Sequence, residues 1–218
     1  MSYHGHVTVD GDAEVRELAE LVITKIAVGD FNNNAYLLRC RKTGEQLLID
    51  AAAEPERLLA TIGEDGLKTV VTTHRHHDHW AALADVVEAT GAQTVAGVDD
   101  VEGIPVRTDR AVKDGDTVTV GNVSLEVISL VGHTPGAIAL LYDDPEGTPH
   151  LFTGDSLFPG GVGNTFGNEA NFESLFHDVT TKLFDRLPGE TWFYPGHGDD
   201  SSLGNERPHL DEWYHRRW

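Results

Sequence analysis

The sequence predicts an α/β fold, in which buried strands alternate with amphipathic helices. Short apolar runs rich in β-branched residues recur along the 218 residues, and stretches with apolar side chains at helical spacing lie between them. No long proline-, serine- or charge-rich linker divides the chain. We therefore expect one domain, with one substantial core, over residues 1–218.

The expected strands are apolar runs that end in turn-forming or polar residues. They cover residues 22–28, 35–40, 46–50, 69–73, 94–96, 117–120, 124–131, 138–142, 151–153 and 192–194. Just before the second run, Asn32-Asn33-Asn34 indicates a turn, because asparagine favours turn conformations.

Three stretches between the runs have the pattern of helices. Residues 54–62 carry Pro55 where a first helical turn tolerates proline, and residues 80–90 place apolar side chains on one face. Residues 171–186 have an apolar stripe that stops before Pro188-Gly189. We expect the aromatic side chains of this stripe to pack in the core rather than bind a cofactor.

The segment His74-Arg75-His76-His77-Asp78-His79 is the strongest functional signal in the chain. It directly follows the β-branched run of residues 69–73, so a buried strand would present it at the edge of a sheet, where α/β proteins build their sites. Neutral imidazoles and carboxylates are ligands of zinc and its first-row neighbours. A histidine tag would lie at a terminus and lack both the aspartate and the strand. The segment therefore predicts a metal site.

Further candidate ligands stand in glycine-rich loops after other apolar runs. They are His133 in residues 132–136 (GHTPG), Asp155 in residues 152–156 (FTGDS) and His197 in residues 194–198 (YPGHG). Glycine permits the sharp turns that aim such side chains inward. Histidines elsewhere, and His77 within the cluster, have no such setting, and we expect them not to bind metal.

Together these motifs resemble those of the metallo-β-lactamase superfamily, from about Val22 to Leu210. Residues 73–79 resemble its T-H-x-H-x-D-H motif and residues 132–136 its G-H-T-P-G motif. Residues 152–158 resemble the F-T-G-D-x-L-F of the glyoxalase II branch, and the closest likeness is to short glyoxalase II-like hydrolases. The resemblance implies a four-layer αββα sandwich, whereas periodicity alone predicts only an α/β fold.

The resemblance also implies two divalent metal ions, with Zn²⁺ expected and iron or manganese as alternatives. The implied ligands are His74, His76 and His133 for the first ion, Asp78, His79 and His197 for the second, and Asp155 as a bridge between them. Asp50, at the end of the third expected strand, would be a carboxylate that orients a ligand histidine.

The implied reaction is hydrolysis of a thioester, with a hydroxide shared by the two ions attacking the carbonyl carbon. Asp78 would be the catalytic residue that orients this nucleophile and receives its proton. A thiol leaving group has a pKa near ~8.5 and needs little acid assistance, so a site without a separate acid suits a thioester.

Two departures from the glyoxalase II pattern make glutathione an unexpected thiol carrier. The usual Cys-Gly-Arg is Val162-Gly163-Asn164 here, and with about twenty residues after His197 we do not expect the helical glutathione-binding domain of full-length glyoxalase II. Three alternatives to thioester hydrolysis remain open. They are a persulfide dioxygenase with one iron, a lactonase with the same ligands, and a metal-binding or sensor module without activity.

Composition limits the partners that the protein can have. With 16 Lys and Arg against 36 Asp and Glu, the net charge of −20 disfavours nucleic acids and anionic membranes, so we expect a small-molecule substrate.

Cys40 is the single cysteine, which rules out an intramolecular disulfide, and we expect it to be a small buried residue. No signal peptide or apolar span is evident, which predicts a cytoplasmic protein. β-Lactamases with a thiolate ligand place cysteine at the position of Asp155, so a true β-lactamase is not expected.

Overall fold

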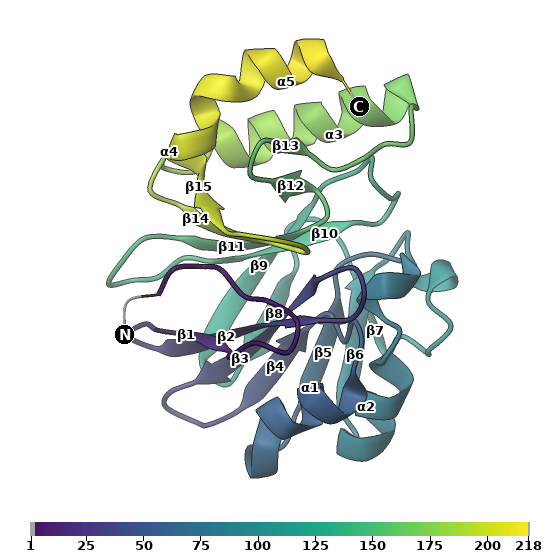
Figure 1. The fold of residues 1–218 in the computed structure, drawn as a ribbon, viewed down its shortest axis with the longest axis vertical. Coiled ribbons are helices and arrows are strands. Elements are labelled where there is room, and N and C mark those ends of the chain that lie inside the picture. Colours follow the sequence, from purple (N-terminus) through teal and green to yellow (C-terminus); the bar gives the residue numbers. More distant parts are fainter. Residues whose placement is uncertain (1–2, 218) are drawn as a thin grey trace.

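The computed structural model describes residues 3–217, and it places two β-sheets face to face with helices on both outer faces (Figure 1). This four-layer arrangement confirms the expected αββα sandwich. The predicted single domain over residues 1–218 stays a prediction, and residues 1, 2 and 218 lie outside the described part.

The first sheet has the strand order β1-β2-β3-β4-β5-β6-β7. Its strands are β1 (Glu14–Glu17), β2 (Leu21–Val28), β3 (Asn33–Cys40), β4 (Gln46–Ile49), β5 (Thr69–Thr72), β6 (Gln93–Gly97) and β7 (Arg110–Val112). The first four strands pair antiparallel, and β4 to β7 pair parallel. Because parallel strands end at the same edge, β4 and β5 deliver Asp50 and the segment after Thr73 side by side.

The second sheet has the order β15-β14-β11-β10-β9-β8. Its strands are β8 (Thr117–Val120), β9 (Val123–Ser129), β10 (Ile138–Tyr142), β11 (His150–Gly154), β14 (Trp192–Pro195) and β15 (Ser201–Ser202). The loop after β9 carries His133, and the parallel strands β11 and β14 carry Asp155 and His197 at their shared carboxyl edge. A small separate hairpin consists of β12 (Leu157–Phe158) and β13 (Gly161–Val162).

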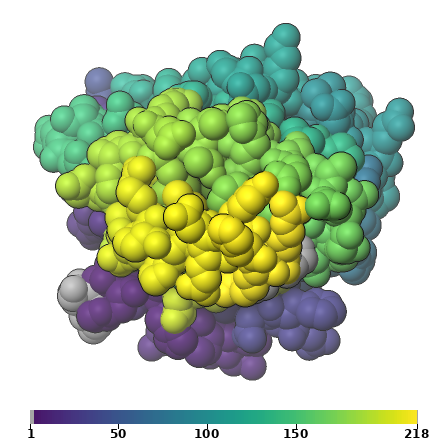
Figure 2. Space-filling model, turned by 90° about the horizontal axis from the view of Figure 1, so that it is seen from above, coloured from purple at the N-terminus to yellow at the C-terminus, as the bar shows by residue number. Residues whose placement is uncertain are grey.

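Helices cover the outer faces of both sheets. They are α1 (Pro55–Ile62), α2 (Leu83–Thr90), α3 (Glu169–Asp178), α4 (Leu203–Glu206) and α5 (Leu210–Arg216), with short 3₁₀ turns at Gly63–Asp65, His77–His79, Val101–Gly103 and Arg207–His209 and a π-helical turn at Val179–Phe184. α1 and α2 lie against the first sheet, and α3 and α5 lie over the second (Figure 1). From above, α5 and α3 form the outermost surface (Figure 2).

The apolar core lies in three layers. Between the sheets, Leu38 and Val71 pack with Leu125 and Phe152, all fully buried. Two further clusters fill the spaces under the α1–α2 pair and under the α3–α5 pair. Burial of this apolar area, at roughly 25 cal/mol per Å², is the main favourable contribution to folding.

Several elements were missed by the sequence patterns, for physical reasons. β1 has the sequence EVRE, with alternating half-buried and exposed residues at the sheet edge, and so lacks an apolar run. α5 buries only Trp213, so it shows no stripe. The expected helix over residues 171–186 begins earlier, at Glu169, and becomes π-helical at Val179. In the described part of the chain, no helix combines the length and the apolar character that a membrane crossing needs.

Candidate metal centre

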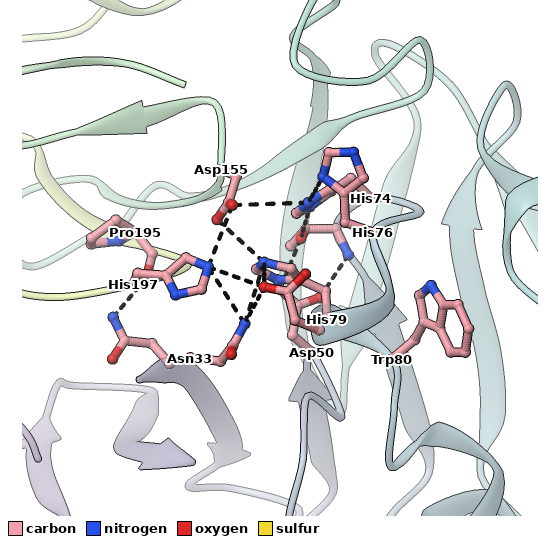
Figure 3. Close-up of polar contacts among 12 residues, drawn as sticks. Asn33, Asp50, His74, His76, His79, Trp80, Asp155, Pro195 and His197 are labelled. Atoms are coloured by element: carbon pink, nitrogen blue, oxygen red, sulfur yellow. Dashed lines mark hydrogen bonds and ion pairs between the residues drawn. The ribbon is translucent and has the colours of Figure 1, made fainter. Parts of the chain in front are cut away.

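The seven predicted ligands come together at one edge of the sandwich, although four separate loops carry them. They form three overlapping groups whose ligand atoms lie within 4.8 Å of one another. The groups are His74, His76 and His133, then His74, His79 and Asp155, and then Asp78, His79 and His197. Figure 3 shows Asp155 between His197 and the pair His74 and His76, whereas Trp80 points away from the cluster.

The first subsite, defined by His74, His76 and His133, consists of three imidazoles. His76 Nδ1 lies 3.1 Å from His74 Nε2 and 2.9 Å from His133 Nε2. Asp155 Oδ2 completes the group at 3.6 Å from His133 Nε2 and 4.0 Å from His74 Nε2.

The second subsite, defined by Asp78, His79 and His197, contains a carboxylate. Asp78 Oδ2 lies 3.4 Å from both His79 Nε2 and His197 Nε2. Asp155 Oδ1 is 3.3 Å from His79 Nε2, and its Oδ2 is 3.4 Å from His197 Nε2. One carboxylate therefore reaches both subsites.

Hydrogen bonds outside the cluster settle which ring nitrogen of three histidines faces it. Nδ1 of His133 lies 2.7 Å from the Asn164 carbonyl oxygen, and Nδ1 of His197 lies 2.9 Å from the Phe31 carbonyl oxygen. Nδ1 of His79 lies 2.8 Å from an oxygen of the Asp50 carboxylate. Since carbonyls and carboxylates only accept, each Nδ1 carries a proton, so Nε2 is the ring nitrogen that faces the centre and that would bind a cation in its unprotonated form.

The same rule holds for His74. Its Nδ1 is 3.1 Å from Thr73 Oγ1, whose own hydrogen is donated to Asp50 Oδ2 at 2.8 Å. Thr73 Oγ1 therefore accepts from His74, whose Nε2 faces inward. Asp50, which is 1% exposed, also accepts the Thr73 backbone N–H at 2.7 Å, so its hydrogen bonds reach the loop and two candidate ligand histidines, His74 through Thr73 and His79 directly.

The residues fit a pair of divalent cations. In a tetrahedral site with Zn–N distances of about 2.0–2.1 Å, neighbouring ligand atoms are roughly 3.3 Å apart, which is close to the separations in both subsites. Several inward lone pairs would repel one another without a cation between them. Asp155 Oδ1 is in addition buried without a hydrogen-bond partner in the described residues.

Burial and charge act differently on the histidines of the two subsites. Burial lowers the pKa of His74, His76 and His133 below the usual value. Burial also acts to lower the pKa of His79, but the carboxylates of Asp155 and Asp50 outweigh it and raise that pKa well above the usual value.

The carboxylates of the centre are held in the charged form. Burial raises the pKa of Asp155, but the surrounding imidazoles, His79 first, outweigh it and bring that pKa well below the usual value. For Asp78, burial raises the pKa and the hydrogen bond from Asn33 lowers it, with a net decrease. Both side chains are therefore carboxylates at neutral pH, which is the form that binds a cation.

Asn33 is a site residue for which the sequence predicted a turn. The structure instead places Asn33 and Asn34 at the buried start of β3. Asn33 Nδ2 donates to Asp78 Oδ2 at 2.9 Å and lies 3.4 Å from His197 Nε2. The predicted turn is present at Asn32, which has a left-handed φ of 52°. For Asn33 and Asn34 tertiary packing overrides the turn signal, because their amides find partners on loops of both sheets.

Asp100 is a second missed residue, and it joins two ligand-bearing loops. It is fully buried, and its Oδ2 accepts the Arg75 backbone N–H at 2.9 Å and the Thr134 hydroxyl at 2.5 Å. Its Oδ1 accepts the Gly136 backbone N–H at 2.9 Å. Asp100 therefore fixes the loop of His74 and His76 relative to the loop of His133. In the sequence it is one of two adjacent aspartates after a strand, and nothing there distinguishes it from a turn residue.

A buried ion pair binds the backbone of the loop that carries His197. Lys25 Nζ lies 2.6 Å from Asp200 Oδ1 and donates to the Gly198 carbonyl at 2.8 Å, with both charged side chains inaccessible to solvent. His77, for which the sequence predicts no metal binding, lies apart from the candidate ligands. It is exposed, packs against the Trp80 ring at 4.7 Å and belongs to none of the three ligand groups.

Comparisons with known proteins identify the family to which the chain belongs. Residues 28–197 match the family model of the metallo-beta-lactamase superfamily. A hydroxyacylglutathione hydrolase from a Polaromonas species is 38% identical over 181 residues, which are 81% of this chain and 66% of that relative. The chain thus spans about two thirds of the length of that relative.

Two solved structures share the fold. A protein described as ETHE1 from Myxococcus xanthus has a TM-score of 0.75 at 31% identity, covering 88% of this chain and 84% of that one. The protein TTHA1623, solved in a di-iron-bound form, has a TM-score of 0.71 at 32% identity, covering 84% of this chain and 96% of that one.

The sequence-based assignment is confirmed on three counts. The family model covers well over half of the chain, the fold is shared with solved members, and several relatives are named hydroxyacylglutathione hydrolases, the activity class of glyoxalase II. The chain belongs to the metallo-beta-lactamase superfamily.

Proposed function

We propose that this protein is a metal-dependent thioester hydrolase with a dinuclear centre. The observation that carries the proposal is the position of Asp155, whose two oxygens lie 3.3–3.6 Å from histidine nitrogens of both subsites. Relatives named hydroxyacylglutathione hydrolase support the thioester as the substrate class. When bound, two divalent cations would lower the pKa of water towards ~7 and polarise the carbonyl group under attack.

Asp78 is the proposed catalytic residue among the side chains of the centre. Asn33 holds its Oδ2 at 2.9 Å, and the side chain is partly exposed to solvent. A carboxylate fixed in this way accepts a hydrogen bond from the attacking water and so orients it, and it then receives the proton. The departing thiolate needs little protonation, since thiols have a pKa near ~8.5.

Zn²⁺ is the proposed metal, and iron and manganese accept the same nitrogen and oxygen ligands. The di-iron form of a solved neighbour makes iron the first alternative to test.

We propose that glutathione is not the preferred carrier, because Asn164 stands where the resembled family has an arginine. A small-molecule substrate remains the expected partner, because the net charge of −20 disfavours binding of a polyanion such as a nucleic acid.

The test is metal analysis of mildly purified protein, followed by assays on thioesters and lactones. We expect close to two ions per chain and hydrolysis of thioesters. One iron per chain with oxygen uptake would overturn the proposal in favour of a dioxygenase, and turnover of lactones alone would make the protein a lactonase. An absence of turnover in fully loaded protein would leave a binding module.

The matched variants are Asp78→Ala and His77→Ala, one residue apart. Asp78→Ala should abolish most turnover and leave the fold intact, because the side chain is partly exposed and contributes to the centre rather than to the core. His77→Ala should retain metal and activity. Comparable losses in the two variants would contradict the assignment of ligands within the cluster.

A further inference from the structure

A groove lies beside the metal centre, at the hairpin formed by β12 and β13. Its volume is about 500 Å³, which is within the range of small-molecule sites. The lining residues are Phe158, Pro159, Gly161, Val162 and Asn164, and none of them is charged.

Two residues that line the groove contact candidate ligands, one in each subsite. The Phe158 ring has its centroid 6.3 Å from that of His197, and the Asn164 carbonyl accepts the Nδ1–H of His133 at 2.7 Å. A molecule whose reacting bond lies at the centre would therefore have one of its substituents within reach of the groove.

Phe166 is 68% exposed, and its backbone N–H donates to the side chain of Asn164, which lines the groove. Its ring centroid is 5.8 Å from the rings of both His76 and His133, so it lies over the first subsite. A single exposed apolar side chain is common and needs no explanation in itself, so the significance of Phe166 lies in its position over the first subsite and close to the uncharged groove.

The backbone of Phe166 supports a functional reason for this exposure. Its φ is 55°, in the left-handed region that bulky residues rarely adopt and that costs on the order of 1 kcal/mol or more. The Asn164 side chain accepts the Phe166 backbone N–H at 2.7 Å and so holds this conformation. Such strain persists where a site depends on it.

We propose that the groove and Phe166 bind a neutral, apolar chain of the substrate, attached on either the acyl or the thiol side of the scissile bond. This inference rests on the proposed hydrolase function and extends it to substrate class. Arg216, which donates to the Gly160 carbonyl of the hairpin, is also 3.3 Å from Glu212 Oε1, so its charge is already paired. Among the described residues, those that line the groove thus offer apolar contact and no charge that would bind a carboxylate.

Two substrate series distinguish the acyl side from the thiol side. In one, acetyl, butanoyl and hexanoyl thioesters share a thiol, and in the other an acetyl group is joined to straight-chain thiols of increasing length. In one of the two series, kcat/KM should rise about two- to fourfold per methylene group. Equal rates along both series, or a preference for chains that end in a carboxylate, would overturn the proposal.

Three variants assign the effect to residues. Phe166→Ala should flatten the length dependence and reduce kcat/KM for the longest substrate about tenfold, mainly through KM, with little change for the shortest. Phe166→Leu should restore most of the dependence. Val15→Ala, at an exposed apolar residue of β1, is the matched control and should change nothing. A loss that is uniform across chain lengths in Phe166→Ala would refute the role of this ring.

Asn164 is a positioning residue in this proposal, because its side chain holds the backbone conformation of Phe166. Asn164→Ala removes the side-chain acceptor and retains the backbone carbonyl that binds His133, so metal content should be unchanged and the length dependence should weaken. Loss of metal together with unchanged selectivity would instead indicate a purely structural role.

A binding measurement separates this inference from the proposed function. Zn²⁺-loaded protein would be titrated calorimetrically with ethanethiol, butanethiol and hexanethiol, and with acetate, butanoate and hexanoate. Affinity should rise with length in one set and stay flat in Phe166→Ala, even if no thioester is hydrolysed, in which case only the proposed function fails. Flat affinities in both sets for the unaltered protein would overturn the inference whatever the activity.

Discussion

The two candidate subsites share the loop of residues 74–79 but differ in their third ligand, in charge and in support. The first contains three imidazoles and is braced from outside by the buried Asp100, which joins its two loops. The second contains Asp78, is braced by Asn33 and has in His79 a histidine tied to two carboxylates. Burial dominates the first subsite, whereas carboxylate charge dominates the second.

This difference predicts two kinds of metal binding. A histidine must be neutral to bind a cation, and the first subsite already holds neutral imidazoles at pH 7 because burial lowers their pKa values. In the metal-free protein the second subsite retains a proton on His79, which an incoming cation must displace. The following predictions test how independent the two subsites are.

The largest effect should come from Asp155→Ala, because this carboxylate reaches both subsites. We expect metal affinity to fall at both, by more than the roughly 10–100-fold that loss of an outer hydrogen-bond partner costs, and turnover to fall with it. Isothermal titration with Zn²⁺ would show the loss. If one ion still bound with unaltered affinity, Asp155 would serve a single subsite.

Asp100→Ala should have the next largest effect, mainly on the first subsite. It leaves the Arg75 and Gly136 N–H groups and the Thr134 hydroxyl without their acceptor, which we expect to cost about 2–4 kcal/mol of unfolding free energy. Denaturant unfolding of the metal-free protein measures this cost, and Zn²⁺ titration should show the weaker binding at the first subsite. A second subsite weakened equally would mean that the loops move as one body.

The candidate ligands and one support, Asp50, could be predicted from the sequence, whereas Asp100 and Asn33 could not, for a physical reason. His74 to His79 lie within one short segment, and each other ligand stands in a local glycine-rich motif. Asp100 and Asn33 act through partners 34 and 45 residues away, respectively, in Thr134 and Asp78. Contacts at such separations depend on how the sheets are packed, which periodicity does not describe.

The same limit applies to the fold. The long apolar runs in the core predicted most central strands, but the hairpin of β12 and β13 has only two residues in each strand. Phe166 next to it is exposed because of a left-handed turn held by Asn164, and this conformation is not visible in residue type. Sequence motifs thus located the candidate ligands, whereas the surroundings proposed to select a substrate could be found only in the three-dimensional structure.

The affinities of the two subsites for Zn²⁺ should also depend differently on pH. The variant His76→Ala removes a ligand of the first subsite, so that the second can be measured alone, and His197→Ala does the reverse. With the pKa of His79 raised, the affinity of the second subsite for Zn²⁺ should fall up to about tenfold per pH unit as the pH decreases below that pKa. With the pKa values of its histidines lowered, the first subsite should hold its affinity to more acidic pH. Titrations of both variants between about pH 5 and 8 would show this order, and coincident profiles would contradict it.

The smallest effect, and the finest test of the comparison, should come from Asn33→Ala. This change removes the hydrogen bond to Asp78 Oδ2 but no ligand, so the pKa of Asp78 should rise and the second subsite should bind Zn²⁺ about tenfold less tightly. The first subsite, which Asn33 does not contact through any hydrogen bond in the described residues, should be unaffected. His77→Ala is the control within the cluster, since that exposed side chain belongs to no ligand group. Stepwise Zn²⁺ titration resolves the two sites, and turnover should follow the occupancy of the second. If turnover in Asn33→Ala fell while both affinities stayed unchanged, Asn33 would act on the orientation of Asp78 towards the attacking water rather than on the metal.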